Sequence, residues 1–149
     1  MATIRIENRQ KGQRISLPKM RRTASRILSA LACPDAELSV LIVSDEEIRE
    51  LNRDFLGRDR PTNVISFPMQ EGEESGLHAD LLGDVVISAD TAARDAAEAG
   101  TDFEKELYFL LLHGILHLVG FNHEGTSAEE VRRMEAKEDE IFALIAAES

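Results

Sequence analysis

The chain has 149 residues, 43% of them hydrophobic, which is enough for one domain with its own buried core. Its formal net charge is −11, and a single cysteine, Cys33, excludes an internal disulfide and suits a reducing compartment. No stretch reaches the roughly 18 apolar residues of a membrane helix and the first residues lack the layout of a secretion signal, so we expect one cytoplasmic domain over residues 1–149 with no membrane span.

The first half of the chain is predicted to alternate strands with helices. Residues 3–7 alternate as a strand does, and Pro18 suits the first turn of a helix that runs to about Ala32 and stops at Cys33-Pro34. β-Branched residues predict a strand over 37–43. The capping box Ser44-Asp45-Glu46-Glu47 then starts a helix to about Phe55.

The second half begins with a loop between Gly57 and Pro61 and a short strand over 63–67. After a polar loop over 70–80, we expect a strand at 84–88 and then three helices, at 90–99, 102–120 and 127–146. Asp102 and Ser127 are the expected N-caps of the last two helices. The pattern favours a small α+β fold, one mixed sheet of about four strands packed with about five helices.

The charges are unevenly distributed along the chain. Residues 1–60 carry 12 Lys and Arg against 9 Asp and Glu, whereas residues 61–149 carry 5 against 19. An acidic total argues against nucleic acid, because phosphate contacts require Lys and Arg. The N-terminal part can nevertheless form a basic surface, whether for a partner or merely solvated.

Three of the four histidines, His113, His117 and His123, fall within eleven residues. Side chains four apart on a helix project from one face with about 6 Å between them, and two imidazoles so placed can hold one ion. Gly120 permits a sharp turn, because glycine adopts positive φ without penalty, and this turn would return His123 as a third ligand. Three nitrogens leave one position open for water, which is typical of a catalytic zinc site. We therefore predict one Zn²⁺ per chain, and we expect His78 to be a bystander.

The spacing His-x3-His-x2-Gly-x2-His is that of the metzincin proteases, which carry a glutamate directly after the first histidine as the base that activates water. Here that position is Gly114, so a peptidase of this kind lacks its base. Glu124, beside the third histidine, is either a substitute or an ordinary loop acid. A metallopeptidase therefore stays as an alternative.

Residues 113–123 resemble the YbeY family of bacterial rRNA-maturation endoribonucleases, whose pattern there is His-Gly-x-Leu-His-Leu-x-Gly-Tyr/Phe-Asp-His. Asn122 stands where the family has aspartate. Residues 51–68 and 82–88 match two further blocks of the family in order and spacing. One position departs, because family members often carry an arginine where this chain has Leu56.

The resemblance implies a single-strand-specific, metal-dependent endoribonuclease with a zincin-like site, in which zinc is bound by the three histidines. It further implies a role at the 3′ end of the small-subunit rRNA and in ribosome quality control, with RNA and the ribosome or its small subunit as partners. A non-catalytic ribosome-assembly factor, in which the metal only braces the fold, stays as a second alternative.

Two further residues are candidates for catalysis. Arg58, with Arg60, lies close enough to Leu56 in sequence to bind phosphate and neutralise developing charge. Asp84, expected at the start of a strand, is either a base, a partner of a histidine or a plain strand-end cap. The segment 62–68 either forms an edge strand whose backbone receives an extended RNA strand or packs as ordinary core.

Overall fold

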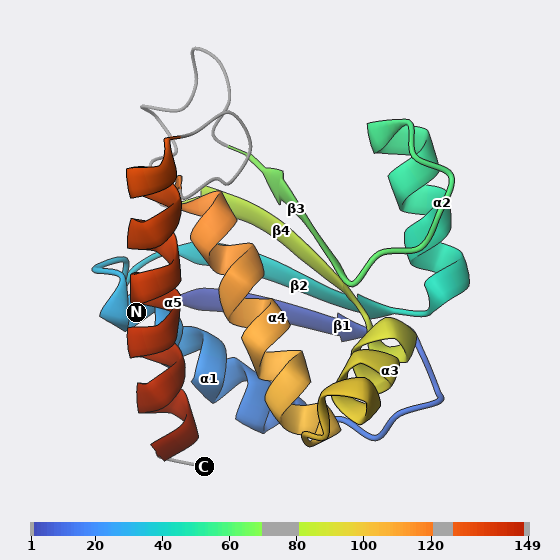
Figure 1. Ribbon diagram of the computed structural model, residues 1–149, viewed down its shortest axis with the longest axis horizontal. Coiled ribbons are helices and arrows are strands. Elements are labelled where there is room, and N and C mark those ends of the chain that lie inside the picture. Colours follow the sequence, from blue (N-terminus) through green and yellow to red (C-terminus); the bar gives the residue numbers. More distant parts are fainter. Residues whose placement is uncertain (1, 70–80, 121–126, 148–149) are drawn as a thin grey trace.

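The computed structural model describes residues 2–69, 81–120 and 127–147 (Figure 1). Within these ranges four strands and five helices follow one another along a single small domain. Their bounds are β1 Thr3–Asn8, α1 Leu17–Ala30, β2 Glu37–Val43, α2 Asp45–Leu56, β3 Val64–Pro68, β4 Leu81–Ser88, α3 Ala89–Ala99, α4 Phe103–Leu118 and α5 Ala128–Ala147.

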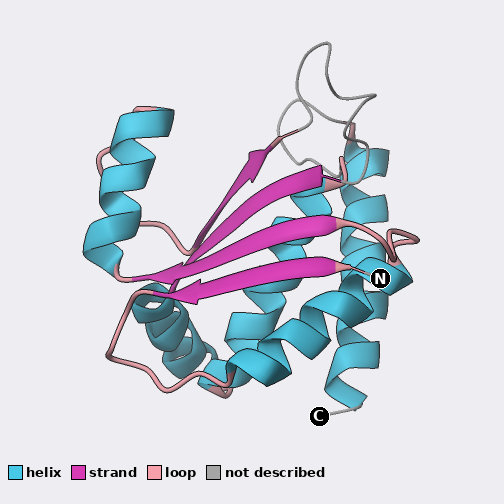
Figure 2. Cartoon of the chain, turned by 180° about the vertical axis from the view of Figure 1, so that it is seen from behind, coloured by secondary structure: helices cyan, strands magenta, loops and turns pink. Residues whose placement is uncertain are grey.

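The strands form one mixed sheet in the order β1-β2-β4-β3. β1, β2 and β4 are parallel, and β3 pairs antiparallel with β4. The two edges of the sheet are therefore β1 and β3, on opposite sides of the molecule (Figures 1 and 2). This confirms the expected α+β fold.

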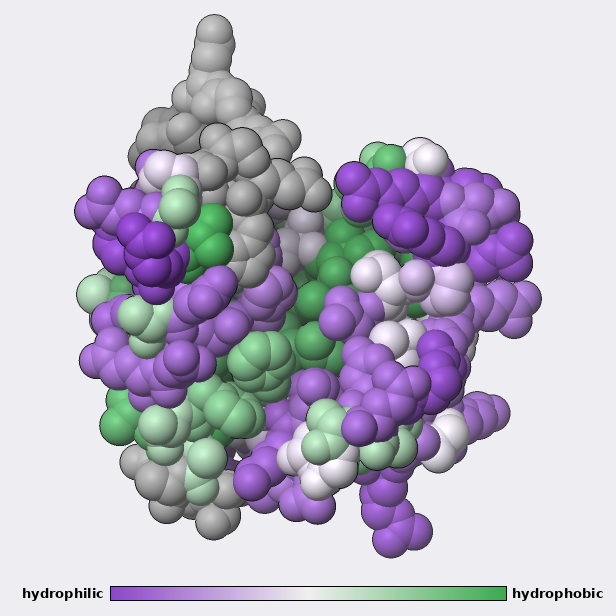
Figure 3. Space-filling model, in the orientation of Figure 1, coloured by the Kyte–Doolittle hydropathy of each residue, from purple (hydrophilic) through white to green (hydrophobic). Residues whose placement is uncertain are grey.

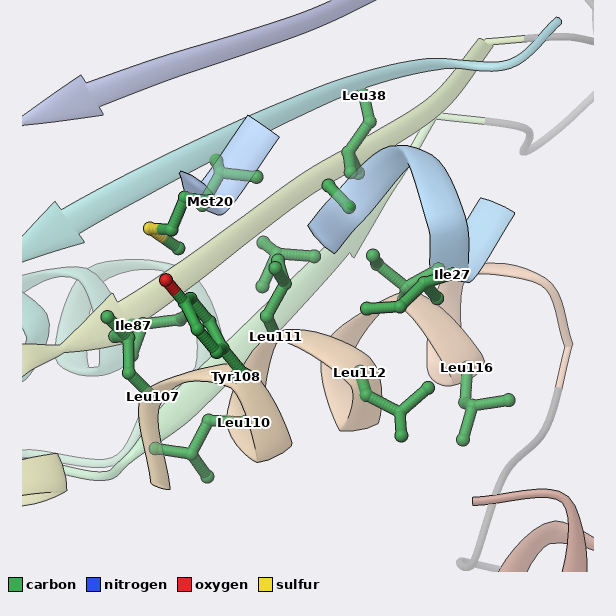
Figure 4. Packing of buried hydrophobic residues seen from close by; sticks show 14 of the residues in the cluster. Met20, Ile27, Leu38, Ile87, Leu107, Tyr108, Leu110, Leu111, Leu112 and Leu116 are labelled. Atoms are coloured by element: carbon green, nitrogen blue, oxygen red, sulfur yellow. The ribbon is translucent and has the colours of Figure 1, made fainter. Parts of the chain in front are cut away.

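Successive side chains of a strand point to opposite faces of the sheet, so the apolar residues of the strands contribute to two cores. The larger core lies between one face of the sheet and α1, α4 and α5. Leu38 and Ile87 of the sheet belong to one cluster there with Ile27 of α1 and Leu111 of α4 (Figure 4). α4 is apolar on nearly all sides because it is enclosed by the sheet and its neighbouring helices. A smaller core lies under α2 on the opposite face of the sheet.

Most helix boundaries follow the predicted signals. Ser44 caps α2 by accepting a hydrogen bond from the Glu47 amide (3.2 Å), and Ser127 does the same for Glu130 (3.2 Å). Asp102 occupies the N-cap position of α4, but its side chain makes no capping hydrogen bond, so that part of the prediction was wrong. Gly120 follows the end of α4 with φ 107°, which confirms the expected turn.

The predicted start of the fourth strand was wrong. β4 begins at Leu81, and a register shift beside Leu38 lets Leu82 enter the strand as an extra residue. Asp84 therefore lies inside β4, paired with Ser39 on one side and Phe67 on the other. Gly83 adopts φ 136° within the strand, next to the extra residue, a conformation that favours glycine.

In the described ranges, no helix combines the length and the apolar character needed to cross a bilayer.

Candidate metal centre and nucleic-acid cleft

α4 places His113 and His117 one turn apart on the same face, as their spacing predicts. Their Nε2 atoms face each other at 3.1 Å, with ring centroids 4.7 Å apart and planes inclined by 68°. Two nitrogens held by one tetrahedral zinc at about 2.0–2.1 Å lie about 3.3 Å apart. The pair is thus spaced as two ligands of a single zinc ion would be.

Glu138 of α5 orients the first histidine. Its carboxylate lies 2.7 Å from Nδ1 of His113, and the glutamate is buried to 8% exposure. An ionised carboxylate can only accept, so Nδ1 carries the hydrogen and Nε2 presents its lone pair toward His117. Phe109 stacks on the His113 ring with a centroid distance of 6.3 Å. Carboxylate and aromatic ring together fix the tautomer and the orientation that metal binding requires.

The third predicted ligand, His123, lies outside the described residues, as do His78, Asn122 and Glu124. Within the ranges that the structure covers, no group of three potential metal ligands is found. The donor set that is in view, two imidazole nitrogens with one supported by a carboxylate, fits zinc.

The two histidines open on a pocket of ≈570 Å³ between the end of α2, the loop 57–63, β3 and α4. Figure 3 shows that the surface is hollowed between α2 and the side of the molecule that carries α4 and α5. Hydrophobic residues lie at the bottom of this hollow. Arg58 and Arg60 line this pocket together with His113 and His117. The structure therefore brings the predicted phosphate-binding arginines and two predicted ligands together, which suits an anionic substrate.

The backbone of the arginine loop is fixed by α2. Gly57 ends the helix with φ 71°, and the buried Asn52 donates from Nδ2 to the Arg60 carbonyl at 2.9 Å. Arg49 holds Asp59 through two hydrogen bonds of 2.8 and 3.3 Å, and these lower the pKa of the Asp59 carboxyl. These contacts hold the backbone on which Arg58 and Arg60 stand in one conformation.

Gly114, at the position of the metzincin base, faces the sheet. A Cβ at this position would lie 2.6 Å from Cγ1 of Val85, which is fully buried, and 3.3 Å from Oγ of Ser66. Ser66 also donates its hydroxyl hydrogen to the Gly114 carbonyl at 2.8 Å. Close contact between α4 and the sheet therefore requires glycine here, and position 114 has no room for a base.

Asp84 is not brought together with the histidines. Its neighbour Val85 packs toward α4, so the alternation of the strand directs Asp84 to the other face of the sheet, where it lines a separate pocket with Arg5 and Ser39. One of the three roles left open for Asp84, partner of a histidine, is filled at His113 by Glu138.

Sequence reasoning missed Glu138 and Asn52, although both carry a signal. Glu138 stands in the buried stripe of α5 with Met134, Ile141 and Ile145, where a carboxylate needs a partner. Asn52 lies one turn after Ile48 on the buried face of α2, and its amide is likewise satisfied.

Fold and site define a class: a small α+β protein whose paired helical histidines open on an arginine-lined cleft. The chain matches the family model of Endoribonuclease YbeY over residues 5–146, and it belongs to that family. It is 64% identical over 97% of both chains to Endoribonuclease YbeY of Syntrophotalea carbinolica, and 58% identical over 95% of both chains to that of Geobacter metallireducens. The solution structure of TM1509 from Thermotoga maritima matches with a TM-score of 0.65 at 28% identity, covering 98% of this chain and 93% of that one.

Proposed function

We propose that this protein, acting through a single domain of residues 1–149, is a metal-dependent endoribonuclease that cuts single-stranded RNA. Its relatives carry the name Endoribonuclease YbeY. The observation that carries the proposal is the pair of Nε2 atoms 3.1 Å apart at the wall of a pocket that Arg58 and Arg60 also line. The same family supports a role in maturing the 3′ end of small-subunit rRNA and in ribosome quality control, in the cytoplasm and with the ribosome or its small subunit as partner.

His113, His117 and His123 would hold one zinc ion. When bound, zinc supplies a Lewis acid for the scissile phosphate and lowers the pKa of a bound water. Glu138 accepts the Nδ1 hydrogen of His113, which leaves the lone pair on Nε2 and orients that nitrogen toward the metal position. Arg58 and Arg60 bind phosphate oxygens and stabilise the charge that develops on them.

The edge strand β3, which lies in the wall of the pocket, favours an extended single strand of RNA as substrate. The hydrogen bonds Ser88 N to Asn63 O and Met69 N to Leu82 O place residues 63 and 69 in pairs that bond to β4. Because bonding alternates along an antiparallel pair, the backbone groups of Val64 and Ser66 point to the outer edge, where both residues line the pocket. A single RNA strand can lie along this edge, with its phosphates toward the arginines.

The peptidase alternative gains no support from this geometry. Position 114 packs against Val85 and cannot carry the glutamate on which that mechanism depends. Casein cleavage that a His113→Ala variant abolishes would revive it.

The test compares cleavage of a labelled single-stranded RNA by the wild type, His113→Ala, a chelator-treated sample and His78→Ala. The last is a matched control, because it removes a histidine outside the motif. We expect cleavage by wild type and His78→Ala only, with all samples folded by circular dichroism. Metal analysis should give one zinc per chain, reduced in His113→Ala.

Equal cleavage by His113→Ala and wild type would overturn the catalytic proposal. Unfolding on metal removal, with no cleavage by any sample, would favour the non-catalytic assembly factor in which the metal braces the fold.

A further inference from the structure

The N-terminal part of the chain carries positive charges on residues that do not line the cleft. Residues 8–34 contain seven Lys and Arg and no Asp or Glu, so this segment contributes +7 while the rest of the chain contributes −18 to the total of −11. The segment comprises the loop after β1, all of α1 and the turn that follows. Positive charge is thus concentrated in one segment of a protein that is otherwise acidic.

Four of these cations lie on the loop after β1 and on the first two turns of α1, and we call this set the basic ridge: Lys11, Arg14, Arg21 and Arg22. All four are exposed, and none forms an ion pair with a carboxylate of the described part of the chain. By contrast, Arg9 is paired with Glu7 and Glu47, and Lys19 is paired with Glu104.

The loop half of the ridge is held in shape by a buried side chain. Gln10 is 8% exposed, and its Nε2 donates to the Gln13 carbonyl while its Oε1 accepts from the Gln13 amide, at 2.9 and 2.8 Å. These bonds close the loop between Lys11 and Arg14. Binding a ligand at these two cations therefore requires little ordering of the backbone.

The helical half of the ridge lies on the second turn of α1. Arg21 and Arg22 lie about 7 Å along α1 from its first residue. Nε of Arg21 donates to the Ile4 carbonyl at 3.5 Å, which places this arginine beside β1, an edge strand of the sheet. The ridge thus follows the β1 side of the molecule (Figure 1).

The ridge and the cleft lie at opposite edges of the sheet. The cleft follows β3, and three strand spacings of about 4.8 Å put the two edge strands roughly 14 Å apart. One RNA can reach both sites only if a segment outside the cleaved strand contacts the ridge. Exposed acids of α5, such as Glu135, Asp139 and Glu140, repel phosphate from the neighbouring surface.

We propose that the basic ridge binds the phosphate backbone of double-helical RNA that flanks the single strand in the cleft. The inference rests on the proposed function for its choice of RNA. Exposed cations on a helix and on the loop before it, without ion pairs among the described residues, suit a regular phosphate backbone. The ridge offers no exposed aromatic side chain on which unpaired bases would stack.

The test measures binding to a blunt RNA duplex by fluorescence anisotropy over a range of salt concentrations. The variant is Arg21→Gln with Arg22→Gln, and the matched control is Arg132→Gln with Arg133→Gln, an exposed arginine pair on α5. Both changes remove two positive charges. We expect the ridge variant to bind roughly tenfold more weakly near 0.1 M salt and to lower the salt slope by about 2, with the control close to wild type.

Cleavage of a short single-stranded oligonucleotide should be unchanged in the ridge variant, and both variants should melt like the wild type. The proposal is overturned by equal losses in both variants, by no loss in the ridge variant, or by a matching loss of oligonucleotide cleavage. It is also overturned if wild type binds vesicles of anionic lipid but not the duplex. If the wild type binds the duplex through the ridge but cleaves no RNA, the proposed function is refuted, whereas the proposal that the ridge binds duplex RNA is supported.

Discussion

Replacing Gly114 with alanine tests how closely α4 must approach the sheet. The added Cβ would lie 2.6 and 3.1 Å from the two methyl carbons of Val85 and 3.3 Å from Oγ of Ser66. Val85 is fully buried and sits on a strand with neighbours on both sides, so it cannot simply turn away. The helix must shift, and it carries His113 and His117 with it.

Two opposing effects set the magnitude. Alanine in place of glycine favours a helix by about 1 kcal/mol, whereas overpacking a core costs about 1–3 kcal/mol. We therefore expect Gly114→Ala to lower the free energy of unfolding by about 1 kcal/mol. In a Val85→Ala background the clashing methyl groups are gone, so the same change should raise stability by about 0.5–1 kcal/mol.

Urea denaturation of the wild type, both single variants and the double variant completes a double-mutant cycle. The expected coupling energy is about 2 kcal/mol in the direction of rescue. RNA cleavage should fall in Gly114→Ala and recover at least partly in the double variant, because the histidines return toward β3. An effect of Gly114→Ala that is the same in both backgrounds would refute this account of the glycine.

Three other predictions concern separate parts of the molecule. Glu138→Gln should weaken zinc binding by about 10- to 100-fold in a chelator competition while the fold measured by circular dichroism is unchanged, because the amide supports His113 less well. For Asp45, burial raises the carboxyl pKa, but hydrogen bonds from two hydroxyls and from Arg94 outweigh burial, so the pKa lies below the ordinary 3.8. Its stabilising effect is therefore present above that value and lost as the pH falls through the lowered pKa. Asp45→Asn should cost about 1–2 kcal/mol at pH 7, and urea titrations should find that the difference shrinks as the pH falls below 3.8. Leu56→Arg adds a guanidinium to the pocket wall and should lower KM for single-stranded RNA several-fold; an unchanged or higher KM would count against phosphate binding at this wall.

Features that depend on neighbours in the chain were predictable. His113 and His117 share a face because the helical period is local, and the structure places their Nε2 atoms together. The serine caps of α2 and α5 and the turn at Gly120 follow from backbone chemistry within a few residues. The helices and strands, and hence the α+β class, could be anticipated for the same reason.

Contacts between distant segments were decided by the tertiary structure. His113 meets Glu138, 25 residues away, only because α4 and α5 pack side by side, and neither residue's local pattern encodes that pairing. The register of β4 turns Val85 toward α4 and therefore places Asp84 on the face away from the histidines, because successive side chains of a strand point to opposite faces. Sequence alone thus determined most of the candidate residues, though not Glu138 or Asn52, and it determined that His113 and His117 share a helix face, since residue type and helical period are local properties. Only the fold decided which of them meet, because burial and strand register depend on the whole chain.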